Sequence, residues 1–328
     1  MNAKSPSDSS IHLPVRTVAG RDLTTLLDRE WLVANGLGGY ACGTLAGAST
    51  RRYHGLLVAA HPAPLGRVMM LNHLTEDFRF PDFKAVSFGG TDHATGPEVH
   101  GADAMAEFRL EAGMPVWRYE AHGHAIEKRI VMPYRRNTVH VTYRLVEGEG
   151  PVRVKLRPSV HFRGHDAPVS VLPAEPYVLS AIDRRYELAG GSAGFPRLRL
   201  RILGDASAFT LDGLELPDVF YRVEENRGYE GVGSLWSPGV FRVTLKPGRD
   251  VSLVASTESW EQIDALPPDR AAMAEIERRS RLILAADPNV RDSFGSELVL
   301  AADQFVIFPA ARVEDAARAH ATGDDART

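Results

Sequence analysis

Apolar residues recur with a period of two over much of the chain, from about residue 30 to about residue 260. Leu198, Leu200 and Ile202 alternate with three arginines, and the same alternation is found over 152–157 and 241–246. Successive side chains of a β-strand point to opposite faces, so each segment has one apolar face and one solvated face. Many such segments, separated by Gly and Pro, predict an antiparallel β-sandwich whose outer faces carry the arginines.

Turn signals predict how some of these strands are connected. Residues 139–146 are largely apolar, and the glycines and the proline within 147–151 predict a hairpin turn into 152–156. Pro247 and Gly248 predict a turn into a last strand at 251–255.

A helical pattern replaces the alternation after Pro267 and Pro268. We expect Asp269 to cap a helix that ends before 287–288. Its apolar face is formed by Met273, Ile276, Ile283 and Leu284. A second stripe consists of Phe294, Leu298, Ala301, Phe305 and Phe308. This stripe either packs back on the sandwich or belongs to the first helix of a following domain, because an apolar helix face needs a partner.

These patterns divide the chain into four segments. We expect a disordered or poorly ordered tail over 1–20, the β-sandwich over 21–265, two helices over 266–308 and a polar tail over 309–328. No large apolar residue follows Val313, so the last segment cannot bury a core of its own. The predicted fold class is mainly β, an antiparallel β-sandwich followed by two α-helices.

Composition and charge argue against some classes of partner and indicate a cellular compartment. The net charge is −4 and acidic residues are interspersed with the arginines, so we expect neither nucleic acid nor a membrane as a partner. The sequence has no apolar run of spanning length, and its polar start lacks the apolar core of a signal peptide. Cys42 is the single cysteine, which excludes an internal disulfide and a multi-cysteine zinc site. We therefore expect a cytoplasmic protein.

The segment 30–60 combines glycines with a cluster of hydrogen-bond donors. Its glycines include Gly36, Gly38, Gly39, Gly43 and Gly47. Arg51, Arg52, Tyr53 and His54 follow, just before the apolar segment 56–60. Planar donors suit sugar oxygens and an aromatic ring suits the C–H side of a sugar, so the cluster predicts a site for a hydroxyl-rich ligand. The alternative is that the arginines pair with nearby acids and that Tyr53 lies in the core.

A second polar pair, His165 and Asp166, follows a strand that ends near Phe162. It either orients a sugar hydroxyl or stabilises its own loop. Residues 36–41 formally fit the dinucleotide fingerprint G-x-G-x-x-G/A. That motif opens a helix and needs an acid about 20 residues later, but the following segment is a poor helix without an acid before Glu76. We expect no cofactor.

Several segments together resemble the N-terminal domain of the glycogen debranching enzymes of bacteria and archaea. The most specific are EWLV at 30–33, NGLGGY at 35–40 and TRRYHGLLVAA at 50–60. Weaker similarities are FRGHD at 162–166, RGYE at 227–230, WSPG at 236–239 and AADQFV at 301–306. The last of these is similar to the block that opens the catalytic domain of the family.

The resemblance implies a supersandwich of the type that precedes the catalytic domain in glucoamylase-like enzymes, then a helical linker and a barrel of paired helices. The implied activity is amylo-α-1,6-glucosidase, acting on α-1,6 branch points of glycogen or a related α-glucan. In the family the catalytic acids lie in the barrel, of which this sequence reaches only the opening block. We therefore expect a domain that shapes the substrate cleft with a barrel partner and is not catalytic by itself. The candidate substrate-binding residues are Asn35, Tyr40, Arg51, Arg52, Tyr53, His54, His165 and Asp166.

No catalytic or metal-binding set emerges from residue spacing. Hydrolysis of a glycoside needs two carboxyl groups at a defined separation, and nothing distinguishes a pair among Glu30, Glu76, Asp77 and Asp166. His122 with His124, and His161 with His165, are alternative metal ligands. Zinc needs three or four converging ligands, so we expect no metal. Two other functions remain open, a non-catalytic α-glucan-binding module and a structural or oligomerisation domain that associates through the stripe of 294, 298 and 305.

Overall fold

The computed structural model describes residues 15–18, 22–191 and 194–309, whose strands form three antiparallel sheets. The nine-stranded sheet has the spatial order β1 (Val15–Val18), β9 (Met105–Glu111), β10 (Met114–Ala121), β11 (His124–Val131), β12 (Thr138–Glu147), β20 (Val251–Ser256), β17 (Leu198–Leu203), β16 (Arg185–Gly191) and β15 (Glu175–Ile182). The six-stranded sheet has the order β18 (Asp205–Phe220), β19 (Val232–Leu245), β13 (Val152–Ser159), β6 (His73–Arg79), β7 (Ala85–His93) and β8 (Gly96–His100). The five-stranded sheet has the order β14 (Arg163–Gly164), β5 (Arg67–Leu71), β4 (Gly55–Ala60), β3 (Tyr40–Thr44) and β2 (Glu30–Ala34).

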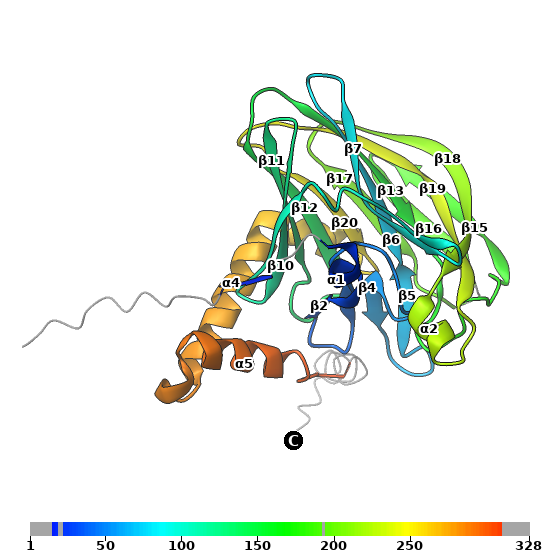
Figure 1. Ribbon diagram of the computed structural model, residues 1–328. Helices are drawn as coiled ribbons and strands as arrows, with labels where there is room; N and C mark the ends of the chain where they lie inside the picture. Colours follow the sequence, from blue (N-terminus) through cyan, green and yellow to red (C-terminus); the bar gives the residue numbers. More distant parts are fainter. Residues whose placement is uncertain (1–14, 19–21, 192–193, 310–328) are drawn as a thin grey trace, which may run out of the picture.

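The two smaller sheets together form one layer of a sandwich, and the nine-stranded sheet forms the other (Figure 1). A single residue, Asn72, separates β5 from β6, and its amide donates to the Ser159 carbonyl at 3.1 Å while its Oδ1 accepts from His161 N at 2.7 Å. This junction lets the chain continue from one small sheet into the other without an unpaired backbone.

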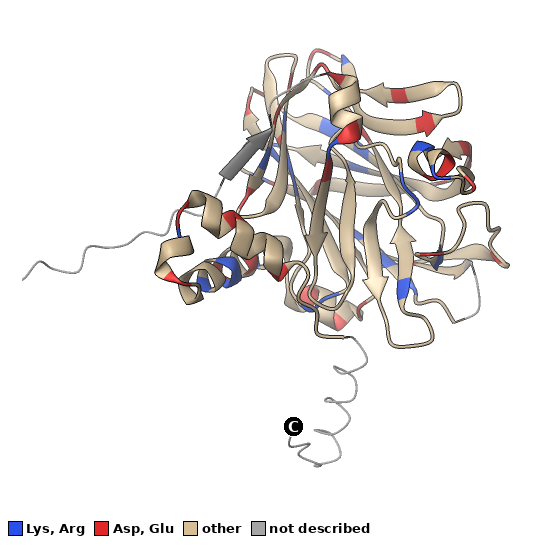
Figure 2. Ribbon diagram, turned by 60° about the horizontal axis from the view of Figure 1, so that its bottom comes forward, with Lys and Arg blue, Asp and Glu red and all other residues tan. Residues whose placement is uncertain are grey.

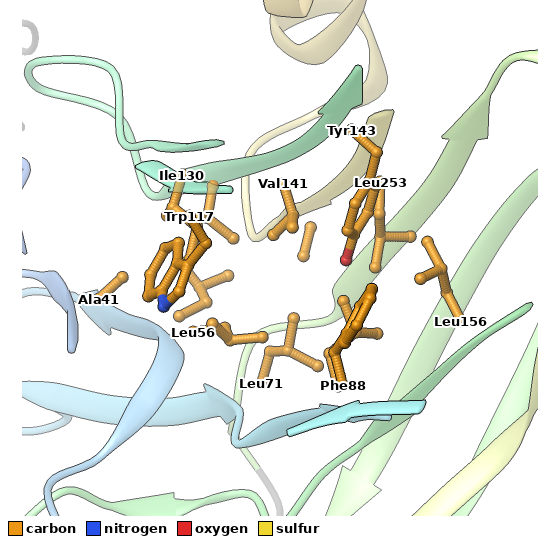
Figure 3. Close-up of a cluster of buried hydrophobic side chains, with 14 of the residues drawn as sticks. Ala41, Leu56, Leu71, Phe88, Trp117, Ile130, Val141, Tyr143, Leu156 and Leu253 are labelled. Atoms are coloured by element: carbon orange, nitrogen blue, oxygen red, sulfur yellow. The ribbon is translucent and has the colours of Figure 1, made fainter. Parts of the chain in front are cut away.

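The core lies between the two layers, where Trp117, Val141 and Tyr143 of the large sheet face Leu71 and Phe88 of the smaller sheets (Figure 3). All five side chains are buried. Burial of each such side chain contributes roughly 1.5–3 kcal/mol, so this interface is the main source of stability. The predicted mainly β sandwich is confirmed.

The alternating segments behave as the sequence predicted, but one predicted connection is wrong. In β17, Leu198, Leu200 and Ile202 are buried while the arginines between them are partly exposed. The segments 139–146 and 152–156 do not form a hairpin, because β12 belongs to the nine-stranded sheet and β13 to the six-stranded one. The turn between them carries the chain from one layer to the other. Turn residues specify a change of direction, not which strand becomes the neighbour.

Part of the predicted N-terminal tail is ordered. Val15–Val18 forms β1, which pairs with β9 at the edge of the nine-stranded sheet. The rest of the predicted tail over 1–20, and residues 310–328 of the predicted polar tail, lie outside the described residues.

Helices cover parts of the sandwich and follow its last strand. They are α1 (Leu23–Asp28), α2 (Arg222–Asn226), α3 (Trp260–Ala265), α4 (Pro268–Ala285) and α5 (Ser293–Asp303), with a 3₁₀ turn at Pro288–Val290. The last two lie together on one side of the sandwich (Figure 1). Within the described ranges, no helix combines the length and the apolar character that crossing a membrane requires.

The buried face of α4 overlaps the predicted one only in part, at Ile276 and Ile283. Its N-cap is Pro267, and Asp269 lies in the first turn instead of capping the helix. Of the predicted apolar face, Ile283 is buried but Met273 is 60% exposed. The buried line includes Glu275 and Arg279, which bind the Tyr134 amide at 2.7 Å and the Ala112 carbonyl at 2.7 Å. The buried side of α4 therefore includes polar side chains, because backbone groups of two loops are their hydrogen-bond partners.

Most of the second stripe is exposed to solvent. Phe294, Leu298 and Phe305 are 69%, 55% and 81% exposed. The buried side of α5 consists of small residues and Leu300. Phe308, the last residue of the stripe, does contact loops of the sandwich: its amide donates to the Gly36 carbonyl at 2.7 Å, and its ring centroid lies 4.7 Å from the Arg135 guanidinium. Both alternatives for the stripe therefore stay open.

Candidate functional site

The turn at 50–54 is fixed on the outer face of the five-stranded sheet. It belongs to the connection between β3 and β4. The Tyr40 hydroxyl and the Cys42 thiol donate to the Tyr53 carbonyl at 3.2 and 3.3 Å. Arg163 of β14 donates to the Arg52 carbonyl. With two successive carbonyls bound by side chains of two strands, the turn is a rigid platform on which Arg51, Arg52 and Tyr53 stay partly exposed.

His54 is buried inside this turn. Its Nδ1 accepts from the amides of Thr50 and Arg51 at 3.1 and 3.4 Å, so Nε2 carries the proton and lies 3.3 Å from Oε1 of Glu30. The imidazole of His54 and the Arg51 guanidinium, 2.6 Å away, together lower the pKa of Glu30 to about 2 against the opposing effect of burial. His54 therefore stabilises the turn and presents no free polar atom at the surface.

Arg52 connects the turn to α2. The fully buried carboxylate of Glu224 accepts from the Arg52 amide at 3.3 Å and lies 3.5 Å from Arg52 Nε. The guanidinium lies over the rings of Tyr53 and Tyr229, 4.9 Å from each centroid, and also donates to the Tyr53 hydroxyl at 2.8 Å. Tyr229 is 52% exposed. Arg52 is thus clamped between two aromatic rings, one of which is open to solvent.

Arg163 joins the loop after β14 to the same turn. Its buried guanidinium donates to the carbonyls of Gly164, His165 and Ala167 at 3.1–3.3 Å, in addition to that of Arg52. Burial lowers the pKa of Arg163. A planar group with five donors can bind several carbonyls at once, so this one side chain sets the position of His165 relative to the turn.

His165 and Asp166 lie beside Tyr53. The rings of His165 and Tyr53 are 5.8 Å apart, and His165 Nδ1 lies 3.3 Å from Oδ2 of the exposed Asp166. Burial lowers the pKa of His165, so its imidazole is neutral at pH 7. We call the set Arg52, Tyr53, His165, Asp166 and Tyr229 the turn surface. It combines aromatic faces, a guanidinium, an imidazole and a carboxylate, the groups that can contact a sugar ring and its hydroxyls.

Asn35 and Tyr40 have structural positions. Asn35 is fully buried, and its side chain binds the amides of Leu37 and Gly39 at 2.9 Å and the carbonyl of Arg136 at 2.9 Å. Tyr40 is partly buried, and burial raises the pKa of its hydroxyl, which is bound to the turn. The structure therefore brings four predicted residues, Arg52, Tyr53, His165 and Asp166, onto one surface.

The family described as glycogen debranching enzyme N terminal matches residues 29–252. The chain belongs to this family. Comparison with curated proteins gives no match. Two solved structures are similar to the chain with a TM-score of 0.34 each, a bacterial glucoamylase complexed with acarbose and a putative kojibiose phosphorylase from human microbiome. Their sequence identities are 10% and 8%, over 89% and 87% of this chain. The chain spans 37% of the length of each.

The fold brings together three of the segments that resemble the family. The turn at 50–54, the loop at 163–166 and the segment at 227–230 all contribute to the turn surface. Residue-level reasoning missed Arg163, Glu224 and Tyr229. The segments that contain Arg163 and Tyr229 were recognised by similarity, but their meeting depends on packing between distant strands. No motif or spacing in the sequence indicates Glu224.

The other candidate acids and histidines of the debranching-enzyme domain lie in different environments. Glu76 is buried in the core beside Lys128, at 2.7 Å, and Tyr143. His161 is buried with Nε2 on the Val171 carbonyl at 2.6 Å. Among the residues that the structure describes, no three His, Cys, Asp or Glu side chains are grouped to hold a metal ion. Basic and acidic positions are mixed over strands and helices (Figure 2).

Proposed function

We propose that this chain is the N-terminal domain of an enzyme that hydrolyses α-1,6 branch points in glycogen or a related α-glucan, and that its turn surface forms part of the substrate cleft. One observation carries the proposal. Segments about 60 to 180 residues apart in the sequence converge so that His165, Asp166 and Tyr229 lie beside Arg52 and Tyr53 of the rigid turn.

The chemistry of the turn surface suits a neutral polyol. Tyr229 offers an exposed ring for the C–H side of a glucose unit, and Arg52 beneath it adds donors for hydroxyl oxygens. The neutral imidazole of His165 and the carboxylate of Asp166 supply acceptors for hydroxyl protons. A sugar needs donors and acceptors on one surface, and this surface has both.

The acids near the turn support a role in binding, with catalytic acids supplied by a helical barrel domain. Glu30, with its pKa of about 2, and the buried Glu224 are held as partners of arginines. A general acid needs a pKa near the working pH, which Glu30 does not have. Release of glucose from a limit dextrin by the purified chain, abolished by a point mutation in it, would contradict this role.

Affinity electrophoresis in gels containing glycogen tests the binding function. We expect the chain to be retarded by glycogen and the Tyr229→Ala variant to be retarded less. Phe83→Ala is the matched control, because Phe83 is also exposed and also lies beside an arginine, Arg79, at 5.9 Å. The proposal is contradicted if glycogen does not change the mobility of the unchanged chain. It is also contradicted if the two variants are retarded equally.

The same gels separate this proposal from the alternative of an independent α-glucan-binding module. A module binds glycogen with the same affinity whether or not a helical domain is attached. A shared cleft binds more tightly when both parts are present, because each contributes contacts. We propose a cytoplasmic location for either function. A chain with a single cysteine cannot form the internal disulfides that are common in proteins of oxidising compartments.

A second candidate function rests on the exposed stripe of α5. Phe294 and Leu298 on α5, and Phe305 just beyond its last residue Asp303, are large apolar side chains exposed to solvent. Apolar patches of this kind mark contact surfaces between proteins. The corresponding function is a structural domain that associates with a second copy of itself.

A further inference from the structure

An open groove of about 630 Å³ lies apart from the turn surface, where α3 meets the loops that follow β4 and β11. Its walls include His61, Tyr134, Arg135, Arg136, Glu258 and Gln262. The volume is within the usual range for sites that hold a small molecule, roughly 300–1,000 Å³. The groove shares no lining residue with the turn surface.

The floor of this groove is rigid. Asn137 is buried, and its side chain binds both the amide and the carbonyl of Ala60, at 2.9 and 2.7 Å. Oε1 of Glu258 accepts from the Asn137 amide at 2.7 Å. The Glu258 carboxylate in the groove therefore already accepts a hydrogen bond from the protein backbone.

The walls have more free donors than acceptors. The guanidinium of Arg135 is exposed, lies 4.7 Å from the Phe308 ring centroid and has no carboxylate partner within the described part of the chain. Arg136 comes only within 3.9 Å of Oε2 of Glu258. Two guanidinium groups and one carboxylate, that of Glu258, thus line the groove, and that carboxylate accepts a hydrogen bond from the Asn137 amide. Such an excess of positive charge and of N–H groups suits an anion.

The backbone of Arg135 is strained. Its φ is +59°, at the third position of a turn in which the Arg136 amide donates to the Pro133 carbonyl at 3.2 Å. Glycine or asparagine is the usual residue in this conformation, and an arginine there is under steric strain. Strained residues of this kind concentrate at binding and catalytic sites. In this turn the strained residue is Arg135, whose guanidinium lines the groove and has no carboxylate partner among the described residues.

We infer that this groove binds the phosphate group of a small phosphorylated ligand, with Arg135 and Arg136 as its principal contacts. A tetrahedral phosphate oxygen pair matches the forked N–H groups of a guanidinium, and charge-assisted hydrogen bonds of this type are the strong ones. The cation–π contact with Phe308 holds the Arg135 guanidinium at the rim before a ligand arrives. The remaining volume, lined by Tyr134, Gln262 and Thr257, accommodates a hexose-sized group.

Calorimetric titration of the whole chain at low ionic strength tests this site, with inorganic phosphate and a hexose monophosphate as probes and a neutral hexose as control. We expect saturable binding of the anions and none of the neutral hexose. Tighter binding of the hexose monophosphate identifies a sugar phosphate as the ligand, and equal binding identifies phosphate alone. Neutral hexose binding equal to that of its monophosphate overturns the inference, as does the absence of saturable binding by both anions.

The variant Arg135→Gly removes the guanidinium and relieves the backbone strain. We expect it to lower phosphate affinity about ten-fold or more, since one charge-assisted contact is lost, without lowering the Tm. Arg184→Gly is the matched control, because Arg184 is also an exposed arginine with a positive φ, +61°, on a hairpin turn distant in sequence from the groove. Equal phosphate affinity in the two variants contradicts the assignment. Tyr229→Ala is expected to bind phosphate normally, so failure here is distinct from failure of the glucan proposal.

Discussion

The buried carboxylate of Glu224 lies 3.5 Å from Nε of Arg52 and accepts a hydrogen bond from the amide of the same residue at 3.3 Å. The same guanidinium lies over the rings of Tyr53 and Tyr229. One arginine therefore compensates a buried charge on α2 and at the same time forms the centre of the turn surface. In the proposed function, stability and glucan binding depend on the same side chain at this point.

Arg52→Ala is expected to destabilise the domain by about 3 kcal/mol, because it leaves the Glu224 carboxylate buried without its cationic partner. The double variant Arg52→Met with Glu224→Gln removes both charges and is expected to recover most of that loss. Urea unfolding measures both. Arg51→Ala is the control, since the pair of Arg51 with Glu30 is more exposed and contributes at most about 1 kcal/mol. Equal losses for the two single variants contradict the role assigned to Glu224.

The strand pattern was predictable because burial in a sheet follows the sequence locally. Leu198, Leu200 and Ile202 are buried at every second position, as their spacing required. The path between sheets was not predictable. The glycines at 148 and 150 permit a turn of either kind, and only the packing of whole layers decides that β13 leaves β12 for another sheet.

The helices show how distant contacts override an apolar pattern. Met273 is exposed while Arg279 is buried, because the carbonyl of Ala112, 167 residues away, needs a donor where α4 crosses. The candidate site also depends on contacts that the sequence pattern does not reveal. His54 belongs to a cluster that suits a ligand, yet Thr50 and Arg51, its own neighbours, occupy Nδ1. Tyr229 completes the surface and is 177 residues from Arg52.

Gly36→Ala is expected to cost about 2–4 kcal/mol. The residue has a φ of +73°, and a Cβ there would overlap Cε2 of Tyr134, so backbone strain and overpacking add. Gly66→Ala is the matched control. Its φ is +62° with nothing within 4 Å of the added Cβ, and strain alone should cost about 1 kcal/mol. Unfolding in urea compares the two, and equal costs contradict the close contact between the loop at 36 and Tyr134.

Glu30 makes stability depend on pH in acid. Its pKa falls from 4.5 to about 2 on folding, through the contacts with His54 and Arg51, so its contribution is complete above pH 4.5 and disappears as the pH falls to about 2. The side chain is 36% exposed, and solvent screening limits the effect to roughly 1 kcal/mol. The difference in free energy of unfolding between the chain and Glu30→Gln should shrink over this range. A difference that stays constant with pH contradicts the contact.

The stripe of α5 predicts how the chain behaves in solution. Phe294 on α5 and Phe305 just beyond its end are exposed, and removing such rings from water is favourable by about 1.5–3 kcal/mol each. With the stripe uncovered, the chain is expected to self-associate as its concentration rises, which light scattering detects. The double variant Phe294→Ser with Phe305→Ser should remain monomeric, whereas Phe83→Ser, which changes an equally exposed phenylalanine elsewhere, should not differ from the unchanged chain. Attachment of a helical domain distinguishes the two possible occupants of the stripe. If that domain covers it, self-association disappears in the longer protein, and if a second copy covers it, the longer protein is still a dimer.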